Sequence, residues 1–178
     1  MSNKSDLLWF PMRVTYNREL KIKEALDKLK IENFLPMRYE WVNKKKILVP
    51  AIHNLIFIHS TQEDITDLKM TKKDFEPLRY MISPTQTKDK GHIIHVPDFQ
   101  MNNFMRVASV QDESIMYLDC NDYINKIGKK VKITEGQFKG VEGVIKRIKK
   151  NKYIVVKIEG LAAVAITYVP ADWIMDIS

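Results

Sequence analysis

Gly128 to Ile145 reads Gly-Lys-Lys-Val-Lys-Ile-Thr-Glu-Gly-Gln-Phe-Lys-Gly-Val-Glu-Gly-Val-Ile and holds four of the six glycines in this chain of 178 residues. Val131 and Ile133 alternate with lysines, which is the pattern of a half-buried strand. Glycines then recur at short intervals before Val144 resumes an apolar run. Because glycine adopts backbone conformations that other residues avoid, this spacing indicates a tightly shaped loop between two strands.

Short strands separated by turn signals continue from this segment to the C-terminus. The strands that we expect are 130–134, 143–148, 153–158, 164–168 and 173–175. Recurring short strands in so short a span predict a small β-barrel.

The N-terminal part of the chain mixes strand and helix patterns. Residues 9–16 are rich in aromatic and β-branched side chains and predict a strand. The spacing of Ile22, Leu26 and Leu29 then predicts an amphipathic helix. The continuous apolar run 55–58 is short enough to be a strand that is buried on both faces.

Two further helices and an exposed turn are expected. Thr61 and Asp64 have the spacing of a capping box at the start of a second helix, and Pro97 suits the first turn of a third. Three lysines at 44–46 predict a solvent-exposed turn. Strands interleaved with helices, without the length for a doubly wound sheet, predict an antiparallel α+β domain.

The fold class that we predict is therefore α+β, with two domains. Residues 1–110 form the domain with an antiparallel sheet and flanking helices, and residues 127–178 form the barrel. The segment 111–126 shows little periodicity, so we place the linker there.

The charge, the cysteine content and the lack of long apolar runs limit the kinds of partner, metal site and cellular location that we expect. The net charge is +7, and residues 116–178 carry +4 of it, which favours a polyanionic partner only weakly because most lysine-rich surfaces are simply solvated. Cys120 is the single cysteine, so an internal disulfide and a cysteine-based metal site are excluded. No apolar run reaches membrane-spanning length and the N-terminus lacks the apolar core of a signal peptide, so we expect a cytoplasmic protein.

The glycine-rich segment resembles the KOW motif, a short element of SH3-like barrels in transcription elongation factors and several ribosomal proteins. The positions that match the motif are Gly136, Phe138, Lys139, Gly140 and Gly143. Ahead of it, four features resemble the N-terminal domain of NusG-type factors: Trp9-Phe10, the helix 19–29, Leu48-Val49-Pro50 leading into 54–58, and Val96-Pro97. The two domains follow one another in the order that this family uses.

Two departures from the general NusG pattern favour a specialised paralogue. Gln137 stands where general factors carry a proline, and Leu161-Ala162-Ala163-Val164 stands where they carry an Arg-x-Thr-Pro segment. Residues 160–166 look most like the UpxY-type paralogues, which act on capsular polysaccharide operons in Bacteroides-like bacteria.

The resemblance implies a monomeric transcription elongation regulator that binds the clamp helices of RNA polymerase and promotes processive elongation or antitermination. The residues that match the docking strands of the family are Phe10, Pro11, Met12, Arg13, Leu55 and Phe57. Side chains alternate along a strand, so only some of them can face outward. The alternative is that Phe10, Met12, Leu55 and Phe57 belong to the core.

Relatives also contact non-template DNA or nascent RNA through basic residues of the N-terminal domain. The matching residues here are Arg18, Lys21, Lys44, Lys45 and Lys46. Such side chains can contact phosphates without specifying bases. The alternative is a solvated helix face and a turn tip.

No motif in the sequence supplies a catalytic constellation, so we expect neither an enzyme nor a metal or other cofactor. His92 and His95 would point to opposite faces of a strand, unlike a helical pair of metal ligands. Two alternative functions stay open: a general NusG that recruits Rho or a ribosomal protein through the KOW domain, and a ribosome- or RNA-binding KOW protein. The β-favouring residues of 128–178 predict a stable barrel instead of a helical hairpin.

Overall fold

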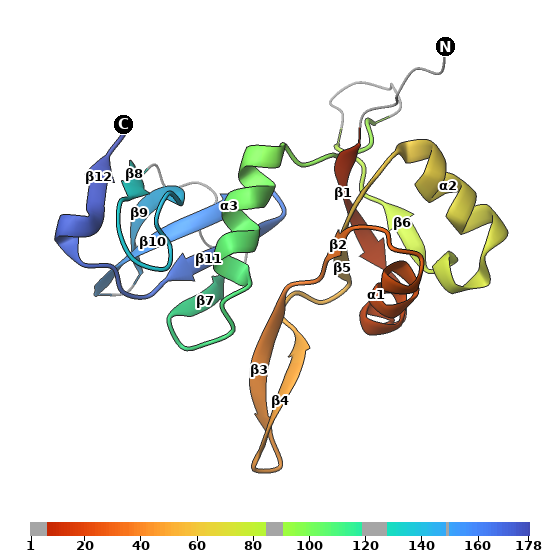
Figure 1. Ribbon diagram of the computed structural model, residues 1–178, viewed down its shortest axis with the longest axis horizontal. Coiled ribbons are helices and arrows are strands. Elements are labelled where there is room, and N and C mark those ends of the chain that lie inside the picture. The colour runs from red at the N-terminus through yellow and green to blue at the C-terminus, as the bar shows by residue number, and fades with distance from the viewer. Residues whose placement is uncertain (1–6, 85–90, 119–127, 149) are drawn as a thin grey trace. The chain divides into compact units, whose positions relative to one another are not determined.

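The computed structural model describes residues 7–84, 91–118, 128–148 and 150–178, which form two compact units (Figure 1). One unit combines Met1–Pro36 with Ile52–Asp98, and the other combines Met37–Ala51 with Phe99–Ser178. Each unit contains antiparallel sheets together with at least one helix. None of the helices in these ranges has the length and apolar character needed to cross a bilayer.

A four-stranded antiparallel sheet forms the centre of the first unit. The strand order is β2-β5-β1-β6, with β1 at Leu8–Val14, β2 at Asn33–Phe34, β5 at Leu55–Ser60 and β6 at Leu78–Tyr80. Its two central strands pair along their whole length. The expected strands at 9–16 and 55–58 are confirmed.

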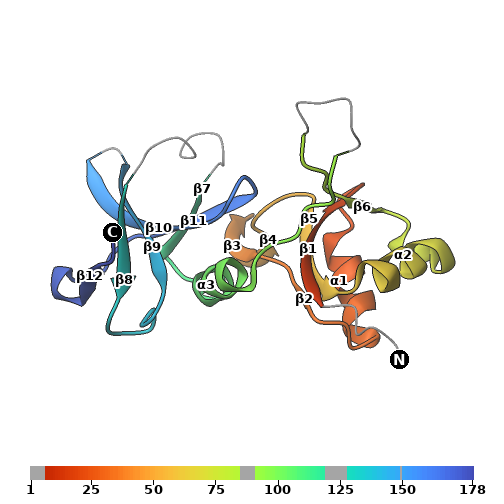
Figure 2. The ribbon, with the colours of Figure 1, turned by 90° about the horizontal axis from the view of Figure 1, so that it is seen from above.

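Two helices lie on the same side of this sheet, as Figure 2 shows. They are α1 at Glu19–Lys28 and α2 at Gln62–Thr71, and the short 3-10 helix η1 follows at Lys73–Phe75. Ile22 and Leu26 of α1 and Ile65 of α2 are fully buried, as expected for amphipathic helices. Thr61 caps α2 by accepting a hydrogen bond from the backbone N–H of Asp64 at 3.1 Å, which confirms the predicted capping residue.

The strands β3 at Met37–Val42 and β4 at Lys45–Pro50 form a separate two-stranded ribbon. The turn lies at Asn43 and Lys44, whose φ angles are 49° and 63°. Positive φ at both central residues is the geometry of a tight two-residue hairpin. The predicted turn at 44–46 is therefore shifted, because Lys45 and Lys46 already belong to β4.

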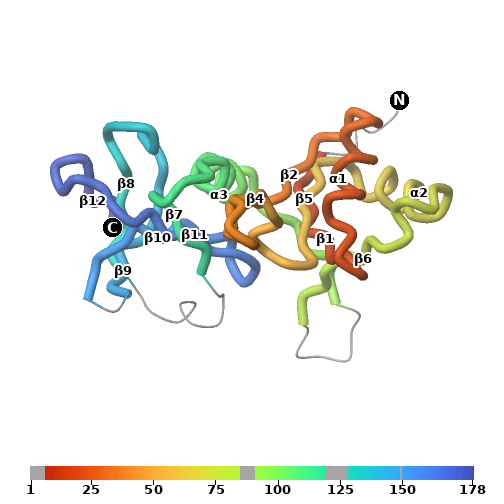
Figure 3. Tube along the Cα trace, turned by 90° about the horizontal axis from the view of Figure 1, so that it is seen from below, coloured from red at the N-terminus to blue at the C-terminus, as the bar shows by residue number. Residues whose placement is uncertain are grey.

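The second unit contains a six-stranded antiparallel sheet with the order β12-β8-β9-β10-β11-β7. Its C-terminal strands are β8 at Lys129–Ile133, β9 at Glu142–Ile148, β10 at Asn151–Ile158, β11 at Ala162–Ile166 and β12 at Ile174–Asp176, the last after the 3-10 helix η2 at Ala171–Trp173. The last strand returns beside β8, as the chain trace in Figure 3 shows. This arrangement is consistent with the KOW-type, SH3-like domain that the sequence predicted.

The sixth strand of this sheet, β7, occupies Ile115–Leu118. It lies inside the range 111–126 that we assigned to the linker, and it pairs with β11. Four residues are too few for an alternating pattern to be recognised, and the partner strand lies far away in the sequence. The rest of the assigned linker from residue 119, including Cys120, lies outside the described residues. The helix α3, at Asp98–Ala108, confirms the third predicted helix.

Candidate interaction surfaces

The six residues predicted to contact a polymerase lie together on the paired strands β1 and β5. Pro11 pairs with Phe57 and Arg13 with Leu55, so these four side chains share one face of the sheet. The other two, Phe10 and Met12, alternate with them and lie on the opposite face. The structure therefore divides the predicted set between two surfaces, as strand alternation requires.

Most of these side chains are buried. Phe57 and Met12 are 0% exposed, Phe10 is 3% and Leu55 is 6% exposed, and Pro11 is buried as well. The core alternative therefore describes the apolar members of the set in this structure. Arg13 is the one member whose side chain is exposed.

The structure adds a residue that the sequence comparison missed. Arg79 on β6 pairs directly with Arg13 on β1, and both are exposed. Two cations side by side on neighbouring strands repel each other, so they form an electropositive patch on this face. The register of β6 against β1 could not be read from the sequence, because the two strands are more than 60 residues apart.

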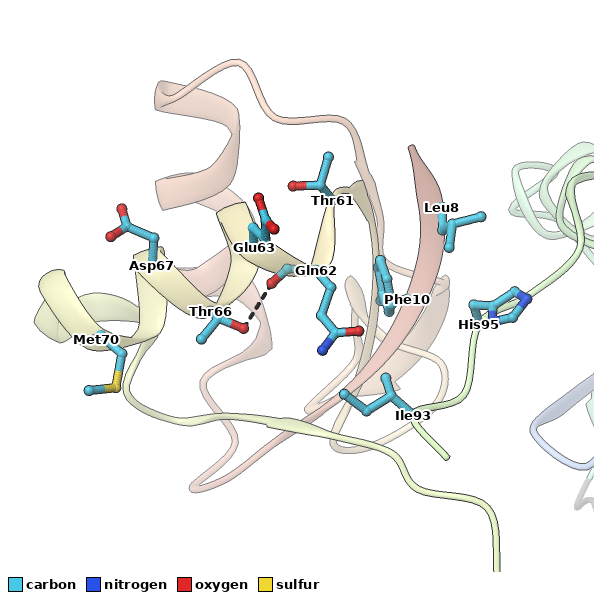
Figure 4. A pocket seen from close by; sticks show the side chains of 10 residues that line it. All are labelled: Leu8, Phe10, Thr61, Gln62, Glu63, Thr66, Asp67, Met70, Ile93 and His95. Atoms are coloured by element: carbon cyan, nitrogen blue, oxygen red, sulfur yellow. Dashed lines mark hydrogen bonds between the residues drawn. The ribbon is translucent and has the colours of Figure 1, made fainter. Parts of the chain in front are cut away.

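On the opposite face, a hollow of about 950 Å³ lies between β1 and α2, and Figure 4 shows its lining. Phe10 lines it from the strand, Gln62 and Thr66 from the helix, and Ile93 and His95 from the segment before α3. Thr66 donates a hydrogen bond to the backbone carbonyl of Gln62 at 2.8 Å.

Tyr80 of β6 contacts two of the residues that line this hollow, Phe10 and Thr66. Its ring meets Phe10 edge-on at 6.1 Å, and its hydroxyl lies 2.9 Å from the Thr66 hydroxyl. Burial raises the pKa of Tyr80 above its usual value of 10.0, so the phenol stays protonated and acts as a hydrogen-bond donor. The Lys69 ammonium lies 4.7 Å from the ring centre, and burial, followed by the charge of Arg79, lowers its pKa. These groups hold α2 on the sheet and form no acid–base pair suited to catalysis.

The basic residues predicted to contact nucleic acid fall into two separate sets. Arg18 and Lys21 belong to the first compact unit, where they line a surface hollow of about 450 Å³. The structure adds Lys28, Lys72 and Lys73 to this set, brought from the end of α1 and the start of η1. Lys28 lies seven residues after Lys21 on the same helix, so helical spacing places it on that face, whereas Lys72 and Lys73 are distant in the sequence and could not be placed there.

The second set, Lys44 to Lys46, belongs to the β3–β4 ribbon in the other compact unit. All three lysines are exposed. The ammonium of Lys46 lies 4.8 Å from the centre of the Tyr39 ring, and the neighbouring Trp41 is 73% exposed. Aromatic residues therefore accompany these lysines, which the run of lysines alone does not reveal.

Two glycines of the KOW-like segment lie where a side chain would not fit. Gly136 has a φ of +76°, and a Cβ atom there would meet the Trp173 ring at 2.5 Å. A Cβ at Gly143 would meet the carbonyl oxygen of Val155 at 2.8 Å. Both positions therefore require glycine, as the sequence predicted from their spacing.

The other motif positions have distinct roles in this loop. Phe138 is 5% exposed and belongs to the barrel core, whereas Lys139 is exposed. Gly140 donates its N–H to the carbonyl of Ile133 at 2.6 Å, and Arg106 of α3 donates to the carbonyl of Lys139. The motif thus shapes the barrel, and only Lys139 offers a charged side chain to a partner.

The histidines take structural or surface positions. His59 stacks on Trp9 with ring centres 4.7 Å apart, and it lies 2.5 Å from the carboxylate of Glu32. His95 lines the hollow beside α2. Within the described ranges, no three His, Cys, Asp or Glu residues come close enough to hold a metal ion.

Comparison with known proteins identifies one family. The sequence profile of the family described as "Transcription termination factor nusG" matches residues 7–105, more than half of the chain. No curated protein sequence matches it. A solved structure described as "Domain interaction in Thermotoga maritima NusG" is 16% identical, with 97% of this chain and 98% of that chain covered and a TM-score of 0.47. A structure of an MjSpt4:Spt5 complex in its conformation B is 13% identical, with coverages of 96% and 97% and a TM-score of 0.27.

Proposed function

Because the chain belongs to the NusG family of transcription factors, we propose that it binds RNA polymerase and promotes processive elongation and antitermination, without catalytic activity of its own. The observation that carries the proposal is the family match over residues 7–105, which covers the sheet with the predicted docking strands. The mechanism is differential binding: a factor that binds the elongating polymerase more tightly than the paused one shifts the equilibrium toward elongation by that difference in affinity.

We place the polymerase contact on the face of β1 and β5 that carries Arg13. Arg13 and Arg79 occupy paired strand positions with exposed side chains, and guanidinium groups suit carboxylates of a partner because they can form bidentate hydrogen bonds with them. The Arg79 guanidinium donates to the backbone carbonyl of Leu78 at 2.8 Å in the free protein. The buried side chains of Pro11, Leu55 and Phe57 support the strands beneath this patch. In this proposal the charged pair makes the contact, and the apolar residues hold its geometry.

Affinity capture with purified RNA polymerase tests this placement. The double charge reversal Arg13→Glu and Arg79→Glu is expected to weaken capture by at least about tenfold, since truncating or reversing charges at an interface costs several kcal/mol. The matched control is Lys30→Glu, an exposed charge reversal in the same unit. Equal capture of the wild type and the double variant would rule out this docking face.

We further propose that the factor acts on a particular operon, as UpxY-type paralogues do. Two features support this. Gln137 occupies the position of the loop proline, and Ala162, Ala163 and Val164 are buried parts of β11, where a general factor has a polar Arg-x-Thr-Pro segment. An in vitro elongation assay with a leader from its own operon and an unrelated leader tests this. Stimulation of both templates to the same extent would instead favour a general NusG that recruits Rho or the ribosome.

We propose that the two basic sets, Arg18 with Lys21 and Lys44 to Lys46, contact nucleic acid in the elongation complex and so support polymerase binding. Arg18 and Lys21 line a hollow with five cations and two carboxylates, Glu24 and Asp74, and Lys46 lies beside the exposed ring of Tyr39. Cations contact phosphates, and exposed rings can stack on bases. Crosslinking of nucleic acid in an elongation complex to either set would support this role, and crosslinks confined to other residues would contradict it.

A further inference from the structure

The end of β9, the start of β10 and the sequence between them carry a dense run of positive charge that the proposed function does not use. Residues 146–152 read Lys-Arg-Ile-Lys-Lys-Asn-Lys, which is five basic residues and no acidic one. Such runs are commonly solvated surface, so charge density alone assigns no role. The positions of the individual side chains in the barrel provide the argument.

The strand register sets two of these charges directly against each other. Lys152 on β10 pairs with Arg147 on β9, and both are exposed. Like charges directly opposite each other destabilise a pair of strands. Within the part of the chain that the structure describes, neither side chain forms an ion pair, whereas Lys132 and Lys157 pair with Glu142 and Glu159 at 3.2 and 2.7 Å. An uncompensated repulsion of this kind is expected where an anionic partner supplies the missing charge.

An apolar hollow of about 310 Å³ opens beside this pair of charges. Lys152 contributes to its lining, and the other lining residues are apolar or aromatic, among them Ile145, Tyr153, Val169 and Ile174. The site therefore combines a lysine in the lining, with Arg147 paired to it on the next strand, and an apolar surface large enough for a planar group.

An exposed aromatic ring lies at the same end of the sheet. Ile166 at the end of β11 pairs with Ile154, which follows Lys152 by two residues on β10. Tyr168 follows Ile166 by two residues, so it lies just beyond β11 at the end of the sheet where β10 begins with Lys152. Its side chain is 77% exposed. Cations next to exposed aromatic rings are typical of surfaces that bind single-stranded nucleic acid.

We infer that this end of the barrel binds single-stranded nucleic acid. Arg147, Lys150 and Lys152 contact backbone phosphates, and Tyr168 stacks on a base. RNA and DNA share this chemistry, and stacking accepts any base, so the site tolerates most sequences. The inference concerns the barrel alone and does not depend on polymerase binding.

Fluorescence anisotropy with labelled single-stranded RNA and DNA of mixed sequence tests the site on the full chain in the absence of polymerase. The test variant is Arg147→Gln with Lys152→Gln. The matched control is Lys132→Gln with Lys157→Gln, which removes the same charge from the same barrel but from lysines that already have partners. We expect the test variant to bind at least about tenfold more weakly at low salt, and the control to stay within about twofold of the wild type.

The salt dependence and the stability separate a binding defect from a folding defect. Each phosphate contact to a single strand contributes about 0.7 to the slope of log affinity against log salt, so losing two contacts lowers the slope by about 1.4. The melting temperature of the test variant should equal or exceed that of the wild type, because a repulsive pair is removed. Tyr168→Ala should weaken binding by about tenfold, whereas Tyr168→Phe should preserve it, since stacking does not need the hydroxyl.

Three results would overturn the inference. The first is unchanged binding by the test variant, and the second is an equal loss of affinity in the control. The third is that polyglutamate displaces the labelled oligonucleotide from the protein at the same concentration of charge as an unlabelled oligonucleotide does. The last result would assign the site to acidic protein segments. Tighter binding of RNA would identify a transcript as the ligand, and tighter binding of DNA would identify an unpaired DNA strand. Equal binding would mean that the site contacts only the chemical groups that RNA and DNA share.

Discussion

The β1–β5 strand pair and the β3–β4 ribbon both contain apolar and aromatic residues, but their surroundings are opposite. Both are antiparallel pairs rich in apolar and aromatic residues. In β5, Leu55 to Ile58 are all buried, whereas Trp41 and Leu48 of the ribbon are 73% and 40% exposed. Both composition and neighbours separate them: the ribbon carries more charged residues, and among the described residues no further strand lies beside it, whereas the first pair lies at the centre of a four-stranded sheet.

The sharpest test of this contrast removes one aromatic ring from each pair. Phe57→Ala should lower the free energy of unfolding by about 3–5 kcal/mol, because it leaves a cavity in a fully buried site. Trp41→Ala should change it by less than about 0.5 kcal/mol, as is usual for exposed side chains. Urea unfolding of the full chain, followed by circular dichroism, measures both. Similar losses for the two variants would mean that the ribbon is also packed in solution.

A second test concerns the connection between α1 and the start of β5. The carboxylate of Glu19, 3% exposed, accepts a hydrogen bond from the backbone N–H of Asn54 at 2.6 Å. Glu19→Ala should cost about 1–3 kcal/mol because this N–H loses its partner. Glu19→Gln keeps an acceptor oxygen and is the matched control. If both variants unfold at the same urea concentration as the wild type, the strand pair does not depend on this bond.

A third, smaller effect is expected at the cap of α2, the helix that lies over Phe10. Thr61→Ala removes the acceptor for the N–H of Asp64 and should cost about 1 kcal/mol. Thr61→Ser retains the acceptor oxygen and should stay close to the wild type. Thermal unfolding distinguishes them, and a Ser variant as unstable as the Ala variant would assign the loss to packing of the Thr methyl group.

The smallest effect is a pH dependence at the edge of the barrel, where β12 pairs with β8. A hydrogen bond from the Lys129 side chain, with further bonds from Ser178, lowers the pKa of Asp176 from 3.8 to about 2. A carboxyl group with a lowered pKa stabilises the fold above its ordinary pKa, and this contribution is lost as the pH falls from about 4 to about 2. The melting temperatures of the wild type and Asp176→Asn should therefore converge over that range. A constant difference between the two would contradict the predicted role of the ion pair.

Local sequence patterns predicted most of the secondary structure because the signals are themselves local. The spacing of Ile22 and Leu26 predicted α1, Thr61 predicted the cap of α2, and the glycines of 128–145 predicted the loop between β8 and β9. β7 was missed because its pairing with β11 joins distant parts of the chain.

The candidate sites were less predictable for the same reason. Arg13 and Arg79 become neighbours only through the register of β1 against β6, and Lys152 faces Arg147 only through that of β9 against β10. Strand alternation indicated that some predicted docking residues must point inward, but the sequence alone could not determine that Phe57 and Leu55 would both be buried. Burial on both faces depends on which elements cover the sheet, which is a property of the whole fold.

The three tryptophans of this chain occupy three different environments, and the protein therefore contains its own optical reporters. Trp9 is buried against His59 in the central sheet, Trp41 stands exposed on the ribbon, and Trp173 covers Gly136 of the barrel loop. Variants that retain one tryptophan each, with phenylalanine at the other two positions, would report separately on the sheet, the ribbon and the barrel. A partner that engages a single region would then change the emission of one reporter and leave the other two unchanged.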